Sequence, residues 1–385
     1  MAESTSYFQK ITIKGFRRLV DVELSMRPMM VMIGVNGSGK TSFLDAWSML
    51  SASSTGQLAA ALSRMGGISY AITRDKADRL EFELESSVSG HAPLKYHLSI
   101  EPQTNAYYIA RETLIQENKP GEMPFKHIES SGSDIRYYDI EDKKLLKPNW
   151  EHRPLETSLS QVPRMFKEPE NLRKTLASCS FYASLDTTFK APIRLPQTMQ
   201  PTLIPSTDGQ DLVSCLYYLR ETDHSRFELL EDTLSTAFAD FERLDFPPVA
   251  AGMLAMTWKD KSFSRPIYTH QLSEGTLRFL WLATVLISQN LPAITLIDEP
   301  EVSMHPELLS LLADLMRDAS KRTQLIVATH SDRLIRFLRP EEVVAIDVED
   351  GEAKLTWADS MDIDHWLKDY TLDEIWAMRR LGAHR

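Results

Sequence analysis

The sequence predicts an α/β fold in which a mixed central sheet is joined to an antiparallel β subdomain and an inserted helical lobe. Residues 29–33 and 294–297 are continuous apolar runs, which is typical of parallel strands buried on both faces. Residues 324–329 form a third strand of this kind. Apolar residues at helical spacing follow the first strand and separate the other two, as expected of an α/β chain.

A glycine-rich turn follows the first of these strands. It reads GVNGSGKT and matches the pattern G-x-x-x-x-G-K-[ST], whose backbone N–H groups close around phosphate oxygens at the start of a helix. We expect Lys40 to reach the β and γ phosphates of ATP and the Thr41 hydroxyl to bind Mg²⁺. The predicted nucleotide-binding residues are Gly34, Asn36, Gly37, Ser38, Gly39, Lys40, Thr41 and Ser42.

Two acidic residues end the strand that begins at residue 294. Asp298 and Glu299 stand at its carboxyl end, the edge where open α/β sheets bind ligands. Adjacent carboxylates beside an apolar strand are costly unless a cation or a reacting water is present. We expect Asp298 to hold Mg²⁺ through its water shell and Glu299 to deprotonate the attacking water. His330 ends the third strand at the same edge, where it is expected to contact the γ phosphate.

A further motif, LSEGTLR, opens an apolar helical segment at residues 272–288. Ser273 is a good helix N-cap, and Gly275 lets the backbone approach a ligand closely. Because the helix is apolar almost all round, we expect it to be buried.

Composition limits the classes of function. With 385 residues and 43% hydrophobic content the chain is globular, with about two to three domains by length. A net charge of −11 argues against broad electrostatic adhesion to nucleic acid or to an anionic membrane. No apolar run approaches a membrane span, and no signal peptide is evident. Two cysteines favour a reducing compartment, so a cytoplasmic protein is predicted.

The other segments are assigned from alternation, proline and glycine. Residues 8–24 predict a hairpin with solvated Arg17 and Arg18 at its turn, and residues 51–67 predict a mobile connection. Three antiparallel strands are expected at residues 80–86, 95–100 and 106–115, and an irregular excursion is expected at 118–163. Helices are expected at 168–178 and 212–241, with a proline-broken segment at 189–210 between them.

Together, the motifs occur in an order that resembles the ATP-binding cassette (ABC) superfamily, and within it the RecF/SMC-like branch. The residues that carry the resemblance are Phe16-Arg17-Arg18, GVNGSGKT, LSEGTLR, DEPEVSMHP, ATHSDRLI and the ending YTLDEIWAMRRLG, which are similar to stand-alone predicted AAA-type ATPases. The resemblance is strong at residues 7–50 and 268–340 and thin between them. It implies an ABC-type P-loop NTPase fold.

The resemblance also implies a homodimer that closes head to tail around two ATP molecules. Ser273, Glu274 and Gly275 would then act in trans on the partner's ATP, and residues 301–305 would lie across the interface. One element of the superfamily has no match, because no glutamine fits the Q-loop. The glutamines considered for it are Gln57, Gln116 and Gln197.

We expect one composite ATPase domain over residues 1–385. Its predicted parts are a nucleotide-binding lobe (1–115 and 290–350), an insertion with the signature-bearing helical lobe (116–289) and a C-terminal extension (351–385). The long separation of Lys40 from Ser273 disfavours a transporter subunit, and the heptads of a coiled coil are missing.

Two functions are compatible with these observations. In the first, an ATP switch clamps nucleic acid in DNA repair or phage (antiviral) defence. In the second, it is a regulatory ATPase module that controls a separate effector, such as a nuclease, without binding DNA itself. Both use Mg²⁺ and ATP, and the sequence names no partner.

Overall fold

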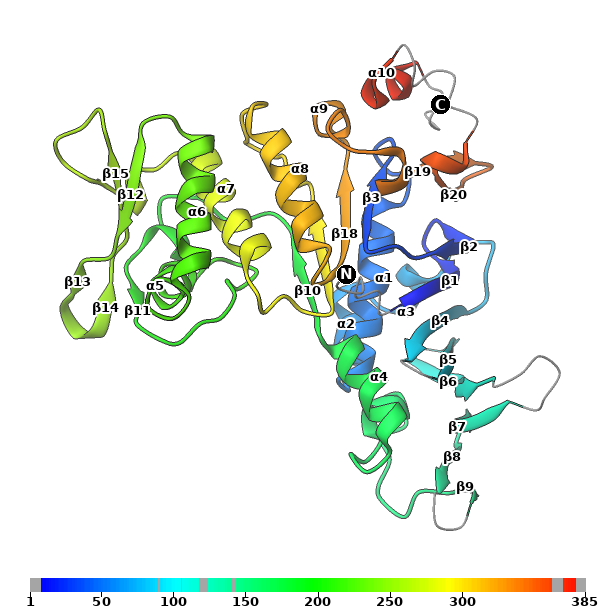
Figure 1. The fold of residues 1–385 in the computed structure, drawn as a ribbon. Coiled ribbons are helices and arrows are strands. Elements are labelled where there is room, and N and C mark those ends of the chain that lie inside the picture. Colours follow the sequence, from blue (N-terminus) through cyan, green and yellow to red (C-terminus); the bar gives the residue numbers. More distant parts are fainter. Residues whose placement is uncertain are drawn as a thin grey trace.

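The computed structural model describes residues 8–88, 91–104, 106–117, 124–139, 143–361 and 370–378. It contains a six-stranded sheet, an eight-stranded antiparallel sheet, and a helical lobe with two small sheets, which lies at the left of Figure 1. Residues 1–7 lie outside the described residues. So do residues 379–382, the last four of the motif YTLDEIWAMRRLG.

The six-stranded sheet is the mixed central sheet that the sequence predicts. Its strands run parallel except for the last, which is antiparallel to its neighbour. The three predicted strands are confirmed and lie side by side. In spatial order the strands are β10 (Cys179–Tyr182), β17 (Ile294–Asp298), β18 (Gln324–Thr329), β3 (Met29–Ile33), β19 (Val343–Glu349) and β20 (Glu352–Trp357).

Strand β3 is fully buried because each of its faces contributes to a different core. Met29, Val31 and Ile33 pack with the helical lobe, whereas Met30 and Met32 pack with α1 (Lys40–Ser54) and the eight-stranded sheet. Side chains alternate between the faces of a strand, so a continuous apolar run serves both cores. The phosphate loop therefore leaves a strand that is buried on both faces.

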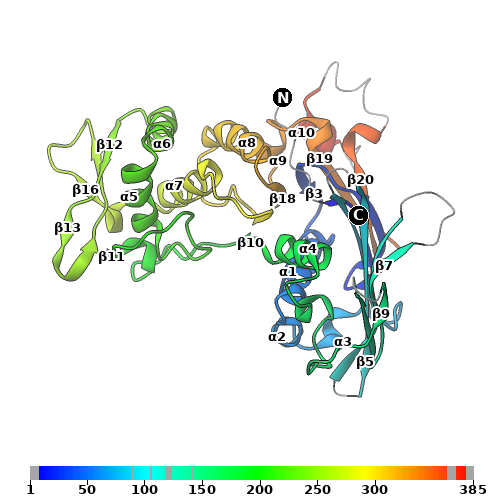
Figure 2. The same cartoon turned by 60° about the horizontal axis from the view of Figure 1, so that its bottom comes forward.

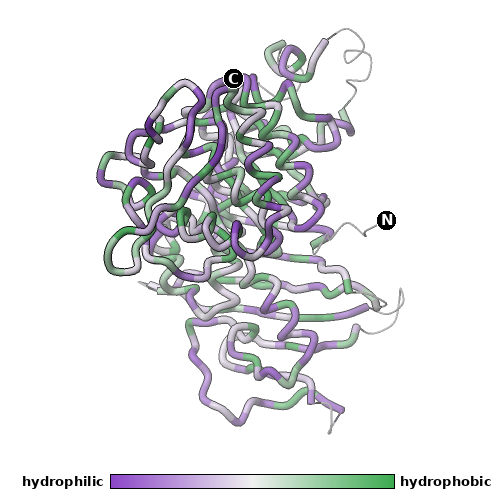
Figure 3. The backbone as a smooth tube through the Cα atoms, turned by 60° about the vertical axis from the view of Figure 1, so that its left-hand side comes forward, coloured by the Kyte–Doolittle hydropathy of each residue, from purple (hydrophilic) through white to green (hydrophobic). Residues whose placement is uncertain are grey.

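The eight-stranded sheet confirms the predicted hairpin and the three predicted antiparallel strands. Hydrophobic and hydrophilic residues alternate along its strands (Figure 3), in agreement with their alternating burial. In spatial order the strands are β2 (Leu19–Ser25), β1 (Phe8–Phe16), β4 (Leu80–Val88), β5 (His91–Gln103), β6 (Ala106–Gln116), β7 (Phe125–Ser131), β8 (Asp134–Asp139) and β9 (Lys144–Leu146).

Two expectations for irregular structure are wrong. Within 118–163, strands β7 to β9 extend the sheet, because Tyr137 is buried and its hydroxyl donates to Ser158 O at 2.8 Å. Within 51–67, α1 continues to Ser54 and α2 (Leu58–Arg64) follows, and α3 (Ile68–Ala71) comes directly after this segment. The first N–H groups of α2 donate to the carboxylate of Glu156, so a distant segment supplies the cap.

The helical lobe follows β10. The predicted helix at 212–241 is two helices, because Asp223 interrupts it and caps the second by accepting a hydrogen bond from Arg226 N. The lobe contains α5 (Leu212–Thr222), α6 (His224–Ala237) and α7 (Glu274–Ile287), a sheet of β11 (Gln197–Thr198), β14 (Met253–Leu254) and β13 (Pro248–Val249), and a sheet of β12 (Phe241–Asp245), β15 (Thr257–Asp260) and β16 (Ile267–Tyr268).

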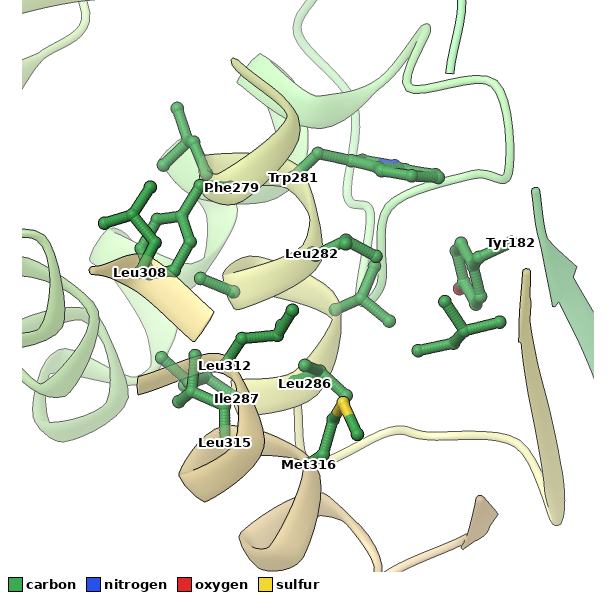
Figure 4. Close-up of a cluster of buried hydrophobic side chains, with 14 of the residues drawn as sticks. Tyr182, Phe279, Trp281, Leu282, Leu286, Ile287, Leu308, Leu312, Leu315 and Met316 are labelled. Carbon is green, nitrogen blue, oxygen red and sulfur yellow. The ribbon is translucent and has the colours of Figure 1, made fainter. Parts of the chain in front are cut away.

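Helix α7 is buried from Leu277 to Ile287, as its composition predicts. It packs against α8 (Leu308–Ala319), and Figure 4 shows Leu282 and Leu286 of α7 facing Leu312 and Met316 of α8. This contact joins the lobe to the six-stranded sheet, and Figure 2 shows α8 lying between α7 and that sheet.

Helix α4 (Lys167–Ala177) confirms the helix predicted at residues 168–178. The remaining helices are α9 (Asp332–Ile335), α10 (Leu372–Ala377), and the 3-10 helices η1 (Leu159–Gln161), η2 (Pro192–Arg194), η3 (Ala250–Gly252), η4 (Thr269–Gln271), η5 (Pro340–Glu342) and η6 (Ala358–Ser360). In the part of the chain that the structure describes, no helix has the length and apolar character needed to cross a membrane. The domain boundaries stay a prediction. Strands β10 and β20 belong to the six-stranded sheet, although their residues fall outside the predicted nucleotide-binding lobe.

Candidate nucleotide-binding site

The phosphate loop requires its glycines for steric reasons. A Cβ atom on Gly34 would lie 2.7 Å from Ile346 O, and Gly37 and Gly39 have φ angles of 77° and 120°, which favour glycine. Gly39 immediately precedes α1, so the loop ends at the first turn of that helix. The predicted loop geometry is therefore present.

Lys40 and Ser38 give this loop its buried polar groups. Lys40 Nζ donates to Gly34 O at 2.7 Å and to Val35 O at 3.2 Å, and the residue is 7% exposed. Burial lowers the pKa of Lys40, and the nearby carboxylates of Glu299 and Asp298 act in the opposite direction. The Ser38 hydroxyl is buried with no partner among the described residues. A glycine cradle with a cation and an unpaired hydroxyl fits a polyphosphate.

Two acidic residues lie at the carboxyl end of β17. Asp298 is in register with Ala328 of β18, and Glu299 N donates to Ala328 O at 2.8 Å. The pKa of Asp298 is raised to about 6, first because burial disfavours the charged form and second because Glu299 adds a like charge. The predicted pair is therefore partly buried and electrostatically coupled to Lys40.

His330 reaches this pair from the end of β18. Its Nδ1 lies 2.8 Å from Glu299 Oε1 and 4.0 Å from Glu301 Oε1. The structure thus brings Lys40, Asp298, Glu299 and His330 to one sheet edge. It shows the histidine next to the proposed base, a contact that the sequence did not predict.

Glu301 is a functional candidate that the sequence analysis placed only in the interface segment. Its side chain is 8% exposed, Thr329 Oγ1 donates to Oε1 at 2.6 Å, and Oε2 is buried without a partner among the described residues. Burial raises its pKa. The signal in the sequence is the third acid of DEPE, which directly follows Pro300.

The hairpin before the phosphate loop lies against α1. Arg17 is not freely solvated as expected, because it has a left-handed φ of 50° and pairs with Asp45, which α1 presents toward the turn. Asp45 in turn contributes to the raised pKa of Asp298. Arg18 is exposed, as expected.

The signature motif presents an exposed helix start. Ser273 Oγ accepts from Thr276 N at 3.1 Å and caps α7. Glu274 Oε1 accepts from Ser303 Oγ at 2.9 Å, and a Cβ on Gly275 would lie 2.3 Å from Ser303 O. The motif therefore rests on residues 301–305 of its own chain, while Ser273 and Glu274 face solvent.

Arg278, one turn farther along α7, is a second residue that the sequence analysis missed. It is 3% exposed, and its Nε has no partner among the described residues. Burial lowers its pKa, and the carboxylates of Glu274, Glu301 and Glu299 oppose that shift. An arginine inside an otherwise apolar helix was the available signal.

None of the glutamines considered for the Q-loop joins the sheet edge. Gln116 donates to Ala92 O, and Gln197 is buried between Pro192 O, Gly209 O and Val213 N. Gln57 precedes α2. The strand beside β17 is β10, whose last residue, Tyr182, pairs with Ile297. The chain continues there as Ala183-Ser184, so no glutamine directly follows this strand.

The metal-binding residues can be judged by their chemistry. Among the residues that the structure describes, no group of three or more His, Cys, Asp or Glu side chains is arranged to hold a metal. Mg²⁺ is usually bound by one or two protein groups together with substrate phosphates. An exposed Thr41 hydroxyl and the Asp298 carboxylate fit that mode.

Comparisons with known proteins agree with the fold. Residues 29–336 match the family described as "AAA domain, putative AbiEii toxin, Type IV TA system". No curated protein matches the chain.

Solved structures of SMC heads share the architecture. An SMC head bound to the C-winged helix domain of ScpA is 15% identical, with a TM-score of 0.57 over 91% of this chain and 98% of that chain. An SMC head with an extended coiled coil, bound to the C-terminal domain of ScpA derived from Pyrococcus furiosus, is 14% identical, with a TM-score of 0.54 over 97% and 99%. The fold is therefore SMC head-like, which confirms the ABC-type, RecF/SMC-like resemblance.

Proposed function

Because the chain belongs to the family of AAA domains described as putative AbiEii toxin of type IV TA systems, we propose that it binds and hydrolyses ATP with Mg²⁺. The observation that carries this proposal is the convergence of Lys40, Asp298, Glu299 and His330 at one edge of the six-stranded sheet. Three neighbouring strands, β3, β17 and β18, deliver these residues.

Each of these side chains has a role that its position supports. Lys40 binds the β and γ phosphates, and Thr41 and Asp298 hold Mg²⁺, which neutralises charge on the phosphates when bound. Glu299 accepts the proton of the attacking water, and His330, 2.8 Å away, holds the Glu299 carboxylate in one orientation.

We also propose that two copies close head to tail around two ATP molecules. The support is the exposed start of α7, where Ser273 and Glu274 face solvent. A helix N-terminus is suited to binding phosphate. Since the Ser273 hydroxyl bonds only with Thr276 among the described residues, it is available to the nucleotide of another copy.

Dimerisation with ATP tests this arrangement. Ser273→Arg should abolish ATP-dependent dimerisation measured by light scattering, because a bulky cation replaces the hydroxyl at the interface. Ser225→Arg is a matched control, since Ser225 is an exposed serine at the start of α6. If Ser273→Arg dimerises at the same ATP concentration as the wild-type protein, the trans role of Ser273 is contradicted.

The switch is proposed to act in DNA repair or phage defence, through nucleic acid or through a separate effector such as a nuclease. The charges of the eight-stranded sheet favour the effector, because several of its cations among the described residues are paired with acids. Examples are Lys10–Glu23, Lys14–Asp21 and Lys95–Glu117. ATPase stimulation by DNA, with an affinity that falls steeply with salt, would instead support the clamp.

A further inference from the structure

Arg194 joins two segments of the helical lobe that are distant in sequence. It is the last residue of η2, and its Nε donates to Thr187 O at 2.6 Å. Its Nη1 donates to Leu272 O at 2.8 Å and to His270 O at 3.2 Å. One guanidinium therefore holds the carbonyl that directly precedes Ser273.

The segment that carries Arg194 is itself fixed at both ends. It leaves β10 at Tyr182, which pairs with Ile297 beside Asp298, so its start belongs to the sheet edge of the nucleotide site. Ile193 is fully buried and anchors the other end in the lobe. Arg194 thus connects the chain leaving the sheet edge to the loop before the signature.

The loop before the signature is shaped by its own hydrogen bonds, from Tyr268 N to Gln271 Oε1 and from Leu272 N to Thr269 O. Thr269 Oγ1 donates to Met256 O at 2.9 Å, which holds its beginning. The two bonds from Arg194 hold its end, on either side of Gln271. Because a guanidinium is planar and rigid, such bonds fix direction as well as distance. The direction in which Ser273 faces therefore depends on Arg194 as well as on the capping bond that Ser273 Oγ accepts from Thr276 N.

We propose that Arg194 is a positioning residue for the signature motif, and that it fixes the loop that presents Ser273 to the ATP bound by a second copy of this chain. The inference rests on the proposed head-to-tail dimer. Arg194 acts through backbone carbonyls and does not itself contact nucleotide. Its loss should therefore weaken closure of the dimer and leave ATP binding by the single copy intact.

The test uses the full chain with Glu299→Gln, in which ATP should persist. Arg194→Met keeps an unbranched side chain and removes the three hydrogen bonds. We expect Arg194→Met to raise the ATP concentration for half-maximal dimerisation at least about tenfold, measured by light scattering. At protein concentrations too low for dimers to form, the affinity of Arg194→Met for a fluorescent ATP analogue should stay within about twofold of that of the parent Glu299→Gln protein.

A matched control removes Arg226 of α6, which bonds to the opposite end of α7. Arg226 Nη1 donates to Ile287 O at 2.5 Å, at the last residue of α7. Arg226→Met should alter thermal stability at most, with dimerisation unchanged. Arg194→Lys, which keeps the charge but loses the planar fork, should lie between Arg194→Met and the parent, and it takes the place of Arg194→Met if that variant does not fold.

The outcomes separate this inference from the function on which it rests. If Glu299→Gln alone forms no dimer with ATP, the proposed dimer is wrong, and Arg194 has no signature role. If Glu299→Gln dimerises and the Arg194 variants dimerise at the same ATP concentration, the dimer stands and the role of Arg194 is overturned. Weakened dimerisation together with weakened analogue binding would also overturn it, since the defect would then lie in the site of the same copy.

Discussion

His330 Nδ1 lies 2.8 Å from Glu299 Oε1, so the residues that follow two adjacent strands meet at one edge of the sheet. Glu299 has a left-handed φ of 49°, a conformation that costs a non-glycine residue about 1–3 kcal/mol. The hydrogen bond from its N–H to Ala328 O holds it there. The strained backbone directs the carboxylate toward the histidine, as expected of a base held in one orientation.

This contact predicts that the two residues act as a unit. His330→Ala should lower kcat, and Glu299→Gln should lower it further. The double variant should be no slower than Glu299→Gln, because the histidine acts through the carboxylate. A coupling energy of about 1–3 kcal/mol is expected from the double-mutant cycle. Additive losses, measured as steady-state ATPase rates, would show that His330 acts independently of Glu299.

Lys40→Ala should weaken ATP binding about 100-fold, because a charge-assisted hydrogen bond contributes roughly 1.5–3 kcal/mol and the buried loop keeps no other cation in its place. Isothermal titration calorimetry with an ATP analogue measures the loss. Lys10→Ala is the control, since Lys10 is a half-exposed partner of Glu23 on the sheet. Wild-type affinity in Lys40→Ala would remove the phosphate loop from the site.

Local patterns were sufficient for the strands and loops that make the nucleotide site. The apolar run of β3 and the glycines at 37 and 39 are visible in the sequence, because burial on both faces and left-handed φ angles leave signatures in adjacent residues. The same holds for Ser273, whose capping role depends on the next turn of its own helix.

Features that depend on distant partners were not predictable. The N-terminal N–H groups of α2 are capped by Glu156, and Tyr137 of β8 bonds to Ser158. Both partners are distant in the sequence, so the residues of α2 and β8 alone do not indicate these elements. The burial of Glu301 and Arg278 likewise depends on how α7 packs on the segment after β17. Sequence spacing gives no account of such packing.

Gly275 is predicted to tolerate no side chain. Its Cβ would lie 2.3 Å from Ser303 O, a backbone atom that cannot move without shifting the segment after Glu299. Gly275→Ala should therefore lower the melting temperature, with a cost of about 1–3 kcal/mol, and should reduce ATP-dependent dimerisation. Ser225→Ala, at an exposed position near the start of α6, is the control for both measurements. An unchanged melting temperature in Gly275→Ala would contradict this contact.

The raised pKa of Asp298 predicts a pH dependence of Mg²⁺ binding. With a pKa of about 6 in the free protein, the carboxylate is ionised above that pH and protonated below it. Affinity for a magnesium complex of a non-hydrolysable ATP analogue should therefore fall as the pH drops from 7 to 5. Because the nucleotide also titrates, the readout is the ratio of wild-type affinity to that of Asp298→Asn. A ratio that is constant with pH would show that Asp298 does not hold the metal.

Glu299→Gln should separate ATP binding from turnover. Glutamine keeps the shape of the side chain and a hydrogen bond to water, but it cannot accept the proton, and general-base assistance is worth about 10² to 10⁴ in rate. Unhydrolysed ATP should then hold the dimer closed, because mass action favours the state that binds it. Size-exclusion chromatography with Mg²⁺ and ATP should show a stable dimer for the variant and a transient one for wild type. Turnover by Glu299→Gln within a few-fold of wild type would mean that another residue, with Glu301 the nearest buried candidate, is the base.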